Sequence, residues 1–254
     1  MHKMPKVSLG TTGLSVSKLG FGPPVNITPG EGARLLFNSF KLGVNFWDTS
    51  DDYGSHPHIA SALKYVPRKD VVISTKTYAK NGKEATESLK NSLKELETDY
   101  LDIFFLHFVQ SDQVEASKKV LKEMKELKTT GIAKAIGLST HSVTVAKKAA
   151  TFDDLDVIMA VCCKANQALI NKYNEFIHLE DGSMQEMFQA LKLAHDNGQI
   201  VIAMKVLGGG APPLIEKYQG AIMAVAQFEF VDALVIGMRN LEEVKKNVEI
   251  IASC

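Results

Sequence analysis

The sequence predicts an α/β protein in which eight parallel strands close into a barrel. The chain has 254 residues, close to the roughly 250 that one such barrel contains. Short apolar runs recur along it, separated by segments with apolar residues at three- and four-residue steps, and this alternation is typical of strand–helix units. Ionisable residues end three successive runs, which favours a closed barrel over an open sheet because a barrel gathers those ends at one mouth.

A β-hairpin is expected before the barrel. The segment KVSLGTTGLSVSKLGFG, residues 6–22, contains two short alternating runs that flank Gly10 and Gly13. This is the pattern of two antiparallel strands joined by a tight turn. No linker rich in Pro, Gly or Ser divides the chain that follows. We therefore expect a single domain over residues 1–254.

The eight barrel strands are predicted from apolar runs, each with turn-forming or polar residues at both ends. The predicted strands cover residues 19–22, 45–49, 71–75, 103–107, 133–139, 157–162, 200–206 and 233–237. Capping-box pairs, in which a side-chain acceptor precedes a glutamate by three residues, predict where three of the helices begin. These pairs are Asp112 with Glu115, Ser183 with Glu186 and Asn240 with Glu243.

Composition excludes several classes of function. Twenty-nine basic residues balance twenty-nine acidic ones, so no net field favours nucleic acid or an anionic membrane. The amino-terminal residues lack a signal-peptide core, and no run approaches the ~18 apolar residues of a membrane span. We therefore expect a cytoplasmic protein. Cys162, Cys163 and Cys254 have the spacing of neither a disulfide framework nor a metal knuckle, so no metal site is expected.

Four ionisable residues stand at the ends of successive predicted strands. The stretch GVNFWDTSDDYG, residues 43–54, carries Asp48 and Tyr53 five positions apart. Lys76 ends the run VVISTK, and His107 ends the run IFFLH. In a parallel barrel the carboxyl ends of the strands form the mouth where catalytic residues collect. These four side chains are the candidate catalytic group.

Seven stretches, taken together in their order, resemble the aldo-keto reductase family. They are LGTTGLSVSKLGFG, GVNFWDTSDDYG, ISTK, DYLDIFFLH, GIAKAIGLS, VLGGG and IGMRNLEEVKKN. The resemblance covers nearly the whole chain and implies an (α/β)8 TIM barrel. It also implies an NAD(P)H-dependent oxidoreductase that transfers a hydride to a small aldehyde or ketone, or from the corresponding alcohol. The family's four catalytic residues fall on Asp48, Tyr53, Lys76 and His107.

Carbonyl reduction can use each of these four residue types. Hydride addition leaves an alkoxide, and Tyr53 is the expected proton donor to it. An unperturbed phenol has a pKa of about 10, and the Lys76 ammonium is expected to favour the ionised form. Asp48 would keep Lys76 charged and oriented, while His107 would donate a hydrogen bond to the substrate oxygen. For any one of these residues taken alone, a structural interpretation is simpler: Asp48 and Lys76 would form a salt bridge, and Tyr53 and His107 would lie at the rim. The four residues together, in this order, favour the catalytic interpretation.

The resemblance places the phosphates and adenosine of the cofactor near the end of the chain. Glycines after the seventh strand would let backbone N–H groups approach a pyrophosphate, although a tight turn also explains them. Arg239 could pair with a 2′-phosphate, whereas Glu243 would repel it and could accept from a ribose hydroxyl. We expect NADPH, with NADH as the alternative. The assigned residues are Leu207, Gly208, Gly209, Gly210, Arg239, Asn240, Glu243 and Asn247.

At the nicotinamide end the sequence departs from the family pattern. Ser139 and Thr140 stand where relatives carry a serine and an asparagine. Cys162 is aligned with the aromatic residue that stacks on the nicotinamide ring, so a flat platform is missing or supplied from elsewhere. Short loops predict an open pocket. These departures keep a non-catalytic, cofactor-sensing or partner-binding relative as the alternative function.

The sequence also raises two alternatives for individual residues, a Schiff-base lysine and a pair of metal-binding histidines. A barrel lyase or isomerase with Lys76 as a Schiff base has little support. His56 and His58 are read as residues at the rim or at a helix start, because no Cys or carboxylate follows at metal-ligand spacing. The expected partner is a small carbonyl or alcohol substrate. The sequence predicts no oligomeric state.

Overall fold

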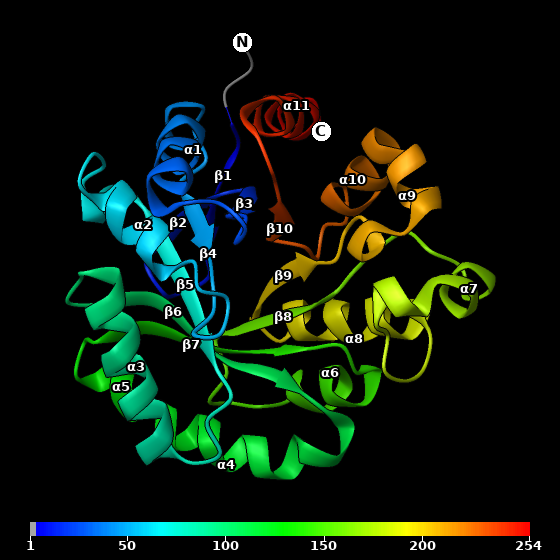
Figure 1. Cartoon of the computed structure of the whole chain (residues 1–254). Coiled ribbons are helices and arrows are strands. Elements are labelled where there is room, and N and C mark those ends of the chain that lie inside the picture. Colours follow the sequence, from blue (N-terminus) through cyan, green and yellow to red (C-terminus); the bar gives the residue numbers. More distant parts are fainter. Residues whose placement is uncertain (1–3) are drawn as a thin grey trace.

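The structure, a computed structural model, describes residues 4–254. Eight parallel strands close into a barrel in the order β10-β3-β4-β5-β6-β7-β8-β9, with helices around it (Figure 1). This arrangement confirms the predicted (α/β)8 TIM barrel. The strands are β3 (Leu19–Gly22), β4 (Phe46–Asp48), β5 (Val72–Thr77), β6 (Leu101–Val109), β7 (Ala133–Thr140), β8 (Val157–Val161), β9 (Ile200–Met204) and β10 (Ala233–Gly237).

The predicted hairpin precedes the barrel and closes its amino end. Strands β1 (Lys6–Leu9) and β2 (Leu14–Ser17) pair antiparallel, and Gly10 and Gly13 take positive φ values of 49° and 73° in the turn between them. Leu9, Leu14 and Val16 are buried in one cluster with the inward-facing residues of the barrel strands. The hairpin therefore plugs the barrel on the side opposite the carboxyl ends of the strands.

Alternation along each strand separates an inner core from an outer one. On β8, Val157 and Met159 belong to the inner cluster, while Ile158 and Ala160 belong to the cluster between the barrel and the helices. Trp47 is fully buried in that outer cluster, as its position beside Asp48 predicts. Because the strands are parallel, residues at their carboxyl ends emerge together at one face.

The helices follow the strands and cover the barrel. Helix α11 packs beside α1 and completes the ring (Figure 1). Their bounds are α1 (Pro29–Lys41), α2 (His56–Leu63), α3 (Gly82–Leu96), α4 (Val114–Met124), α5 (Glu126–Thr129), α6 (Val143–Ala149), α7 (Gln167–Ile177), α8 (Met184–Asp196), α9 (Pro212–Glu216), α10 (Tyr218–Ala226) and α11 (Leu241–Ala252). No helix in this part of the chain has the length and apolar character that crossing a bilayer needs.

Helix starts agree with the predicted caps in two of three cases. Ser183 and Glu186 form a complete capping box at α8, and the Asn240 side chain accepts from the Glu243 backbone N–H at the start of α11. The prediction at Asp112 is wrong. That residue lies inside a 3₁₀ turn, Ser111–Gln113, because the chain begins to coil one turn before α4.

Candidate active site

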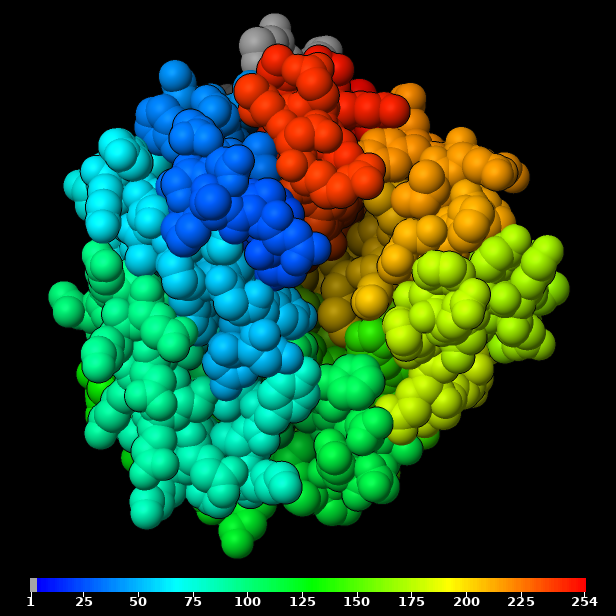
Figure 2. Space-filling model, in the orientation of Figure 1, coloured from blue at the N-terminus to red at the C-terminus, as the bar shows by residue number. Residues whose placement is uncertain are grey.

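Four elements at the carboxyl end of the barrel carry the predicted catalytic residues. Asp48 ends β4, Lys76 and His107 lie near the ends of β5 and β6, and Tyr53 lies in the turn that follows β4. The space-filling view shows a hollow near the centre of one face of the molecule, where segments distant in sequence meet (Figure 2). The structure therefore brings all four predicted residues to one end of the barrel.

Asp48 and Lys76 form a buried ion pair. Lys76 Nζ donates to Asp48 Oδ2 and to the Thr49 carbonyl oxygen, both at 2.7 Å. Ser74, the neighbour of Asp48 across β4 and β5, donates to Asp48 Oδ1 at 2.6 Å. Asp48 is 5% exposed and Lys76 is 2% exposed. A buried pair is tolerated when further hydrogen bonds satisfy its remaining groups, and here Thr49 and Ser74 supply them.

Tyr53 stands beside this pair with its hydroxyl at the mouth. The Tyr53 Oη atom lies 3.4 Å from His107 Nε2, and the Lys76 ammonium lies 5.2 Å from the centroid of the phenol ring. Burial, followed by the carboxylates of Asp48 and Asp52, raises the pKa of the Tyr53 phenol above its ordinary value. The lowering expected from Lys76 is not found, because the ammonium is directed to Asp48. Tyr53 is a protonated acid at neutral pH.

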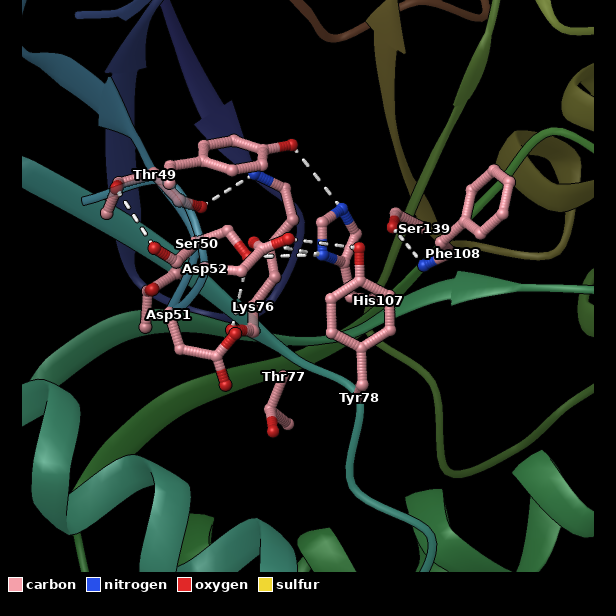
Figure 3. Close-up of polar contacts among 12 residues, drawn as sticks. Thr49, Ser50, Asp51, Asp52, Lys76, Thr77, Tyr78, His107, Phe108 and Ser139 are labelled. Carbon is pink, nitrogen blue, oxygen red and sulfur yellow. Dashed lines mark hydrogen bonds and ion pairs between the residues drawn. The ribbon is translucent and has the colours of Figure 1, made fainter. Parts of the chain in front are cut away.

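His107 is held by groups on both sides of its ring. Ser50 Oγ lies 3.1 Å from His107 Nδ1, and the Tyr78 ring lies against the imidazole with 4.6 Å between centroids (Figure 3). Burial, and secondly the Lys76 charge, lowers the pKa of His107 to about 3. The ring is therefore neutral at physiological pH and carries a single proton. The contact with Ser50 leaves Nε2 facing the mouth.

Phe108 extends the wall of the site and was not predicted from the sequence. Its φ of 51° is unusual for a residue with a side chain, and it falls where the pairing of β6 with β7 shifts register. The Phe108 N–H donates to Ser139 Oγ at 2.9 Å (Figure 3), and its ring contacts His141 edge-on. Such strain persists only where surrounding contacts impose it, and it clusters at functional sites.

Ser139 and Thr140, predicted for the nicotinamide end, are both buried but differ in how their hydroxyl groups are hydrogen-bonded. Ser139 Oγ accepts from Phe108, which leaves its own O–H without an acceptor among residues 4–254. Thr140 is fully buried; its hydroxyl donates to the Val109 carbonyl at 2.8 Å and accepts from the Ser142 N–H. Thr140 is therefore used by the fold, whereas Ser139 retains a donor.

Cys162 does not occupy the position expected of a nicotinamide platform. It follows β8 in the outer series and is fully buried in the cluster between barrel and helices. Burial also raises the pKa of its thiol, so the group is inert. Met204 instead ends β9, one step beyond Ile202 in the inner series, and is partly exposed. Alternation along β9 could have identified Met204.

The glycine-rich loop is a turn that uses its own N–H groups. Gly208 N–H donates to the Lys205 carbonyl at 2.6 Å, and Gly210 N–H donates to the Leu207 carbonyl at 3.1 Å. A Cβ at Gly209 would lie 2.1 Å from the Phe176 carbonyl oxygen, so glycine is required there by α7. A tight turn, the alternative to a phosphate-binding loop, therefore explains Gly208 and Gly209. Gly210, with φ of 103°, has open space beside it.

Lys205, which was not predicted from the sequence, places a cation against this loop. Its φ is 56°, and its ammonium would lie 3.4 Å from a Cβ placed at Gly209. Burial lowers the pKa of Lys205, and no carboxylate among residues 4–254 forms an ion pair with it. A half-buried ammonium without a counter-charge is a candidate contact for an anion.

Arg239 and Glu243 form a closed pair at the start of α11. Glu243 accepts from the Arg239 backbone N–H at 2.8 Å and from its Nε at 3.0 Å. Asn240 Oδ1 accepts from the Glu243 N–H at 2.9 Å. The Arg239 side chain is nevertheless 85% exposed. The chain's own carboxylate therefore occupies the guanidinium that was predicted to pair with a 2′-phosphate.

Asn247 on α11 carries an unsatisfied polar group. The residue is fully buried, and its Oδ1 accepts a hydrogen bond from the hydroxyl of Tyr218. Its Nδ2 has no partner among the described residues. A buried amide without an acceptor is costly, so this atom is a candidate donor to a ligand.

His56 and His58 lie at the start of α2, away from the mouth. His56 contacts Thr75 Oγ1 at 2.8 Å and Glu95 Oε2 at 2.6 Å. His58 Nε2 contacts the Ile27 carbonyl at 3.0 Å. Within residues 4–254, no group of three or more His, Cys, Asp or Glu side chains is arranged to hold a metal ion.

Fold and site together define an (α/β)8-barrel protein with acid–base residues at the carboxyl mouth. The sequence matches the Aldo/keto reductase family over residues 6–220. The chain belongs to this family of oxidoreductases, whose members use NAD(P)H.

Individual relatives are similar over part or most of their length. The chain is 31% identical to L-galactose dehydrogenase of Arabidopsis thaliana over 159 residues, which cover 55% of this chain and 49% of that protein. It is 30% identical to pyridoxine 4-dehydrogenase of Escherichia coli over 236 residues, 81% of this chain and 74% of the relative. The chain thus spans about half the length of the first of these proteins.

A solved aldo-keto reductase from Bacillus halodurans, in its holo form, has the same fold. The TM-score is 0.76 at 22% identity, and the match covers 98% of this chain and 90% of the other. At this identity the likeness is evidence for the fold alone.

Proposed function

We propose that this protein is an NAD(P)H-dependent oxidoreductase that reduces a small aldehyde or ketone. The observation that carries the proposal is the assembly of the four predicted groups around one point. Tyr53 Oη and His107 Nε2, 3.4 Å apart, face the mouth above the Asp48–Lys76 pair. Two polar groups so placed can both contact one carbonyl oxygen.

Each residue has a distinct part in this chemistry. Tyr53, which is protonated at neutral pH, donates its proton to the oxygen as negative charge develops there. Lys76 supplies positive charge beside the phenolate that results, and Asp48 fixes the ammonium. His107 remains neutral and donates from Nε2 when Ser50 donates to Nδ1. Ser50 is thus a positioning residue.

The residues present fit a nicotinamide dinucleotide, which supplies the hydride when bound. The Nδ2 of Asn247 is a buried donor that lacks an acceptor, which suits a ring nitrogen of adenine. Lys205 is a cation that forms no ion pair within residues 4–254, and its ammonium lies against the glycine loop, 3.4 Å from a Cβ placed at Gly209, which suits a phosphate. Ser139 keeps an O–H that can donate to a carboxamide. Met204 offers a polarisable apolar surface in place of a flat ring.

The choice between the two cofactors rests on Arg239 and Glu243. The expected preference for NADPH requires the Arg239 guanidinium to leave the Glu243 carboxylate and pair with the 2′-phosphate. The pair as it stands, with Glu243 bonded to both the backbone and the guanidinium of Arg239, favours NADH. Because Arg239 is 85% exposed, the exchange needs only a side-chain rotation.

The test is a titration of the purified protein with NADPH and NADH, followed by fluorescence, with turnover of a panel of small aldehydes. Tight binding of either cofactor together with reduction of at least one aldehyde is the expected result. Binding without turnover of any carbonyl or alcohol would support the non-catalytic alternative. Absence of binding to both cofactors would refute the proposal.

A further inference from the structure

The mouth contains a carboxylate that the proposed mechanism does not use. Asp52 lies in the turn between Asp48 and Tyr53, and its Oδ1 is 3.9 Å from His107 Nδ1. Tyr78 donates its hydroxyl to Asp52 Oδ2 at 3.3 Å while its ring lies against His107 (Figure 3). Asp52 and Tyr78 therefore form one polar edge next to the proposed reacting centre.

Asp51, the preceding residue, has the same charge but a different direction. Its Oδ2 accepts from Ser88 on α3 at 2.9 Å, so its carboxylate is bonded to the helix layer. The Asp52 side chain is 47% exposed and is directed along the mouth. Both aspartates are exposed, but they differ in their partners: Asp51 is bonded to α3, whereas Asp52 lies beside His107 and Tyr78.

The charge of Asp52 is not neutralised by the described part of the chain. No Lys or Arg among residues 4–254 forms an ion pair with it; its nearest basic group is His107, which stays neutral because its pKa is lowered to about 3. The field of Asp52 contributes, after burial, to the rise in the pKa of Tyr78 to about 12. A substrate would meet a negative charge at this edge. Lys205, which forms no ion pair among residues 4–254, lies instead beside the glycine loop.

We propose that Asp52, with Tyr78, selects small carbonyl compounds that carry a hydroxyl or ammonium group near the carbonyl and disfavours those that carry a carboxylate. This inference rests on the proposed reductase function. A carboxylate accepts hydrogen bonds from hydroxyl and ammonium groups. It repels a second carboxylate a few ångströms away, and between exposed charges that water and salt screen, this repulsion is worth about tenfold in affinity.

The inference is tested by comparing glyceraldehyde, glyoxylate and propanal as substrates of the wild type, Asp52→Asn and Asp51→Asn. Each kcat/KM is divided by the value for propanal, which carries neither group. In Asp52→Asn, we expect the glyoxylate ratio to rise about tenfold and the glyceraldehyde ratio to fall several-fold. Asp51→Asn removes the same charge one residue away, where the carboxylate is bonded to α3, and should change both ratios much less. Unchanged ratios in Asp52→Asn, or equal changes in both variants, would overturn the inference.

A binding measurement separates failure of this inference from failure of the proposed function. Glycolate and ethylene glycol are titrated into each protein while the ring protons of His107 are followed by NMR. Asp52→Asn should tighten glycolate relative to ethylene glycol by about the same tenfold, whether or not any aldehyde is turned over. If the wild type reduces nothing but this shift appears, only the reductase proposal fails. If the relative affinity does not move, the selection by Asp52 is refuted.

Discussion

Both ends of the barrel hold a buried ion pair, but the carboxyl end also keeps charged groups that have no counter-charge in the described part of the chain. At the amino end, Asp102 is 1% exposed and pairs with Arg68 at 2.7 Å and Lys134 at 2.9 Å. It also accepts from the Ile73 N–H at 2.9 Å, so every group of this cluster has a partner. At the carboxyl end, Lys205 has no counter-charge among residues 4–254. A region that only has to be stable can satisfy its polar groups, whereas a binding region keeps some of them open.

Backbone strain follows the same division. Phe108 and Lys205 take φ values of 51° and 56°, and both lie at the carboxyl ends of strands. Glu97 and His178, the other residues with side chains and positive φ between residues 4 and 254, cap the ends of helices α3 and α7. Left-handed backbone at a helix C-cap is ordinary, whereas for a residue with a side chain at the end of a strand it is not. This contrast indicates that the chain accepts a cost in stability at the mouth, where the strained backbone positions side chains.

The largest effect on stability is expected from removing Asp102. Asp102→Asn leaves Arg68 and Lys134 without their carboxylate and should lower the free energy of unfolding by about 3 kcal/mol, a value reduced because Lys134 is partly exposed. Chemical denaturation measures this change, with turnover per folded molecule unaltered. As a control, Lys192→Met breaks the exposed pair with Asp196 and should cost less than about 1 kcal/mol. Equal losses of unfolding free energy in the two variants would contradict the distinction between a buried, fully paired cluster and an exposed ion pair.

A smaller effect is expected from the pH dependence of the mouth. The pKa of His107 is about 3 in the folded protein and about 6.5 when unfolded, so the unfolded state binds more protons between these values. Stability should therefore fall as the pH is lowered from about 6.5 towards 3, by up to about 2 kcal/mol at pH 5 from this residue. His107→Asn should flatten this slope in denaturation curves measured at pH 7 and pH 5. A slope unchanged by the substitution would show that His107 is not held neutral.

The smallest effect concerns the cofactor. Glu243→Gln frees Arg239 and removes a carboxylate from the start of α11, so NADPH should bind about fivefold more tightly, as an exposed pair is worth about 1 kcal/mol. The affinity for NADH should not increase. Fluorescence titration with both cofactors measures the change, and Glu242→Gln, at an exposed residue paired with Lys245, is the matched control. A parallel gain for NADH would remove Arg239 from the discrimination.

The sequence predicted the fold well because periodicity reports burial directly. All eight barrel strands lie within a few residues of their predicted positions, and the hairpin turn falls at Gly10–Gly13. The four catalytic candidates were placed for the same reason, since parallel strands send their carboxyl ends to one face. Asp112 failed as a cap because the same spacing fits a 3₁₀ turn as well as an α-helix start.

Cofactor contacts were harder to predict because they depend on which neighbour a polar group chooses. Glu243 could have faced a ribose, but it binds Arg239. The glycines after β9 could have cradled a phosphate, but two of them serve the turn and α7. Cys162 was placed at the mouth, although alternation along β8 directs it outward. The roles proposed for Lys205 and Asp52, and the position of Phe108, depend on a positive φ or on the direction of a side chain, which the sequence pattern does not report.

The most direct measurement makes the same chemical change at both ends of the barrel. Tyr53 stands at the mouth, and Tyr100 lies at the amino end between Arg68 and Lys134, at 4.0 and 4.2 Å from their cationic groups. Single-turnover reduction of the best aldehyde of the panel is compared in Tyr53→Phe and Tyr100→Phe, with cofactor affinity and thermal melts as controls. Tyr53→Phe should slow the reaction by about 10²–10⁴-fold with cofactor affinity retained, and Tyr100→Phe should not slow it. A Tyr53→Phe protein that keeps most of the wild-type rate would contradict the account.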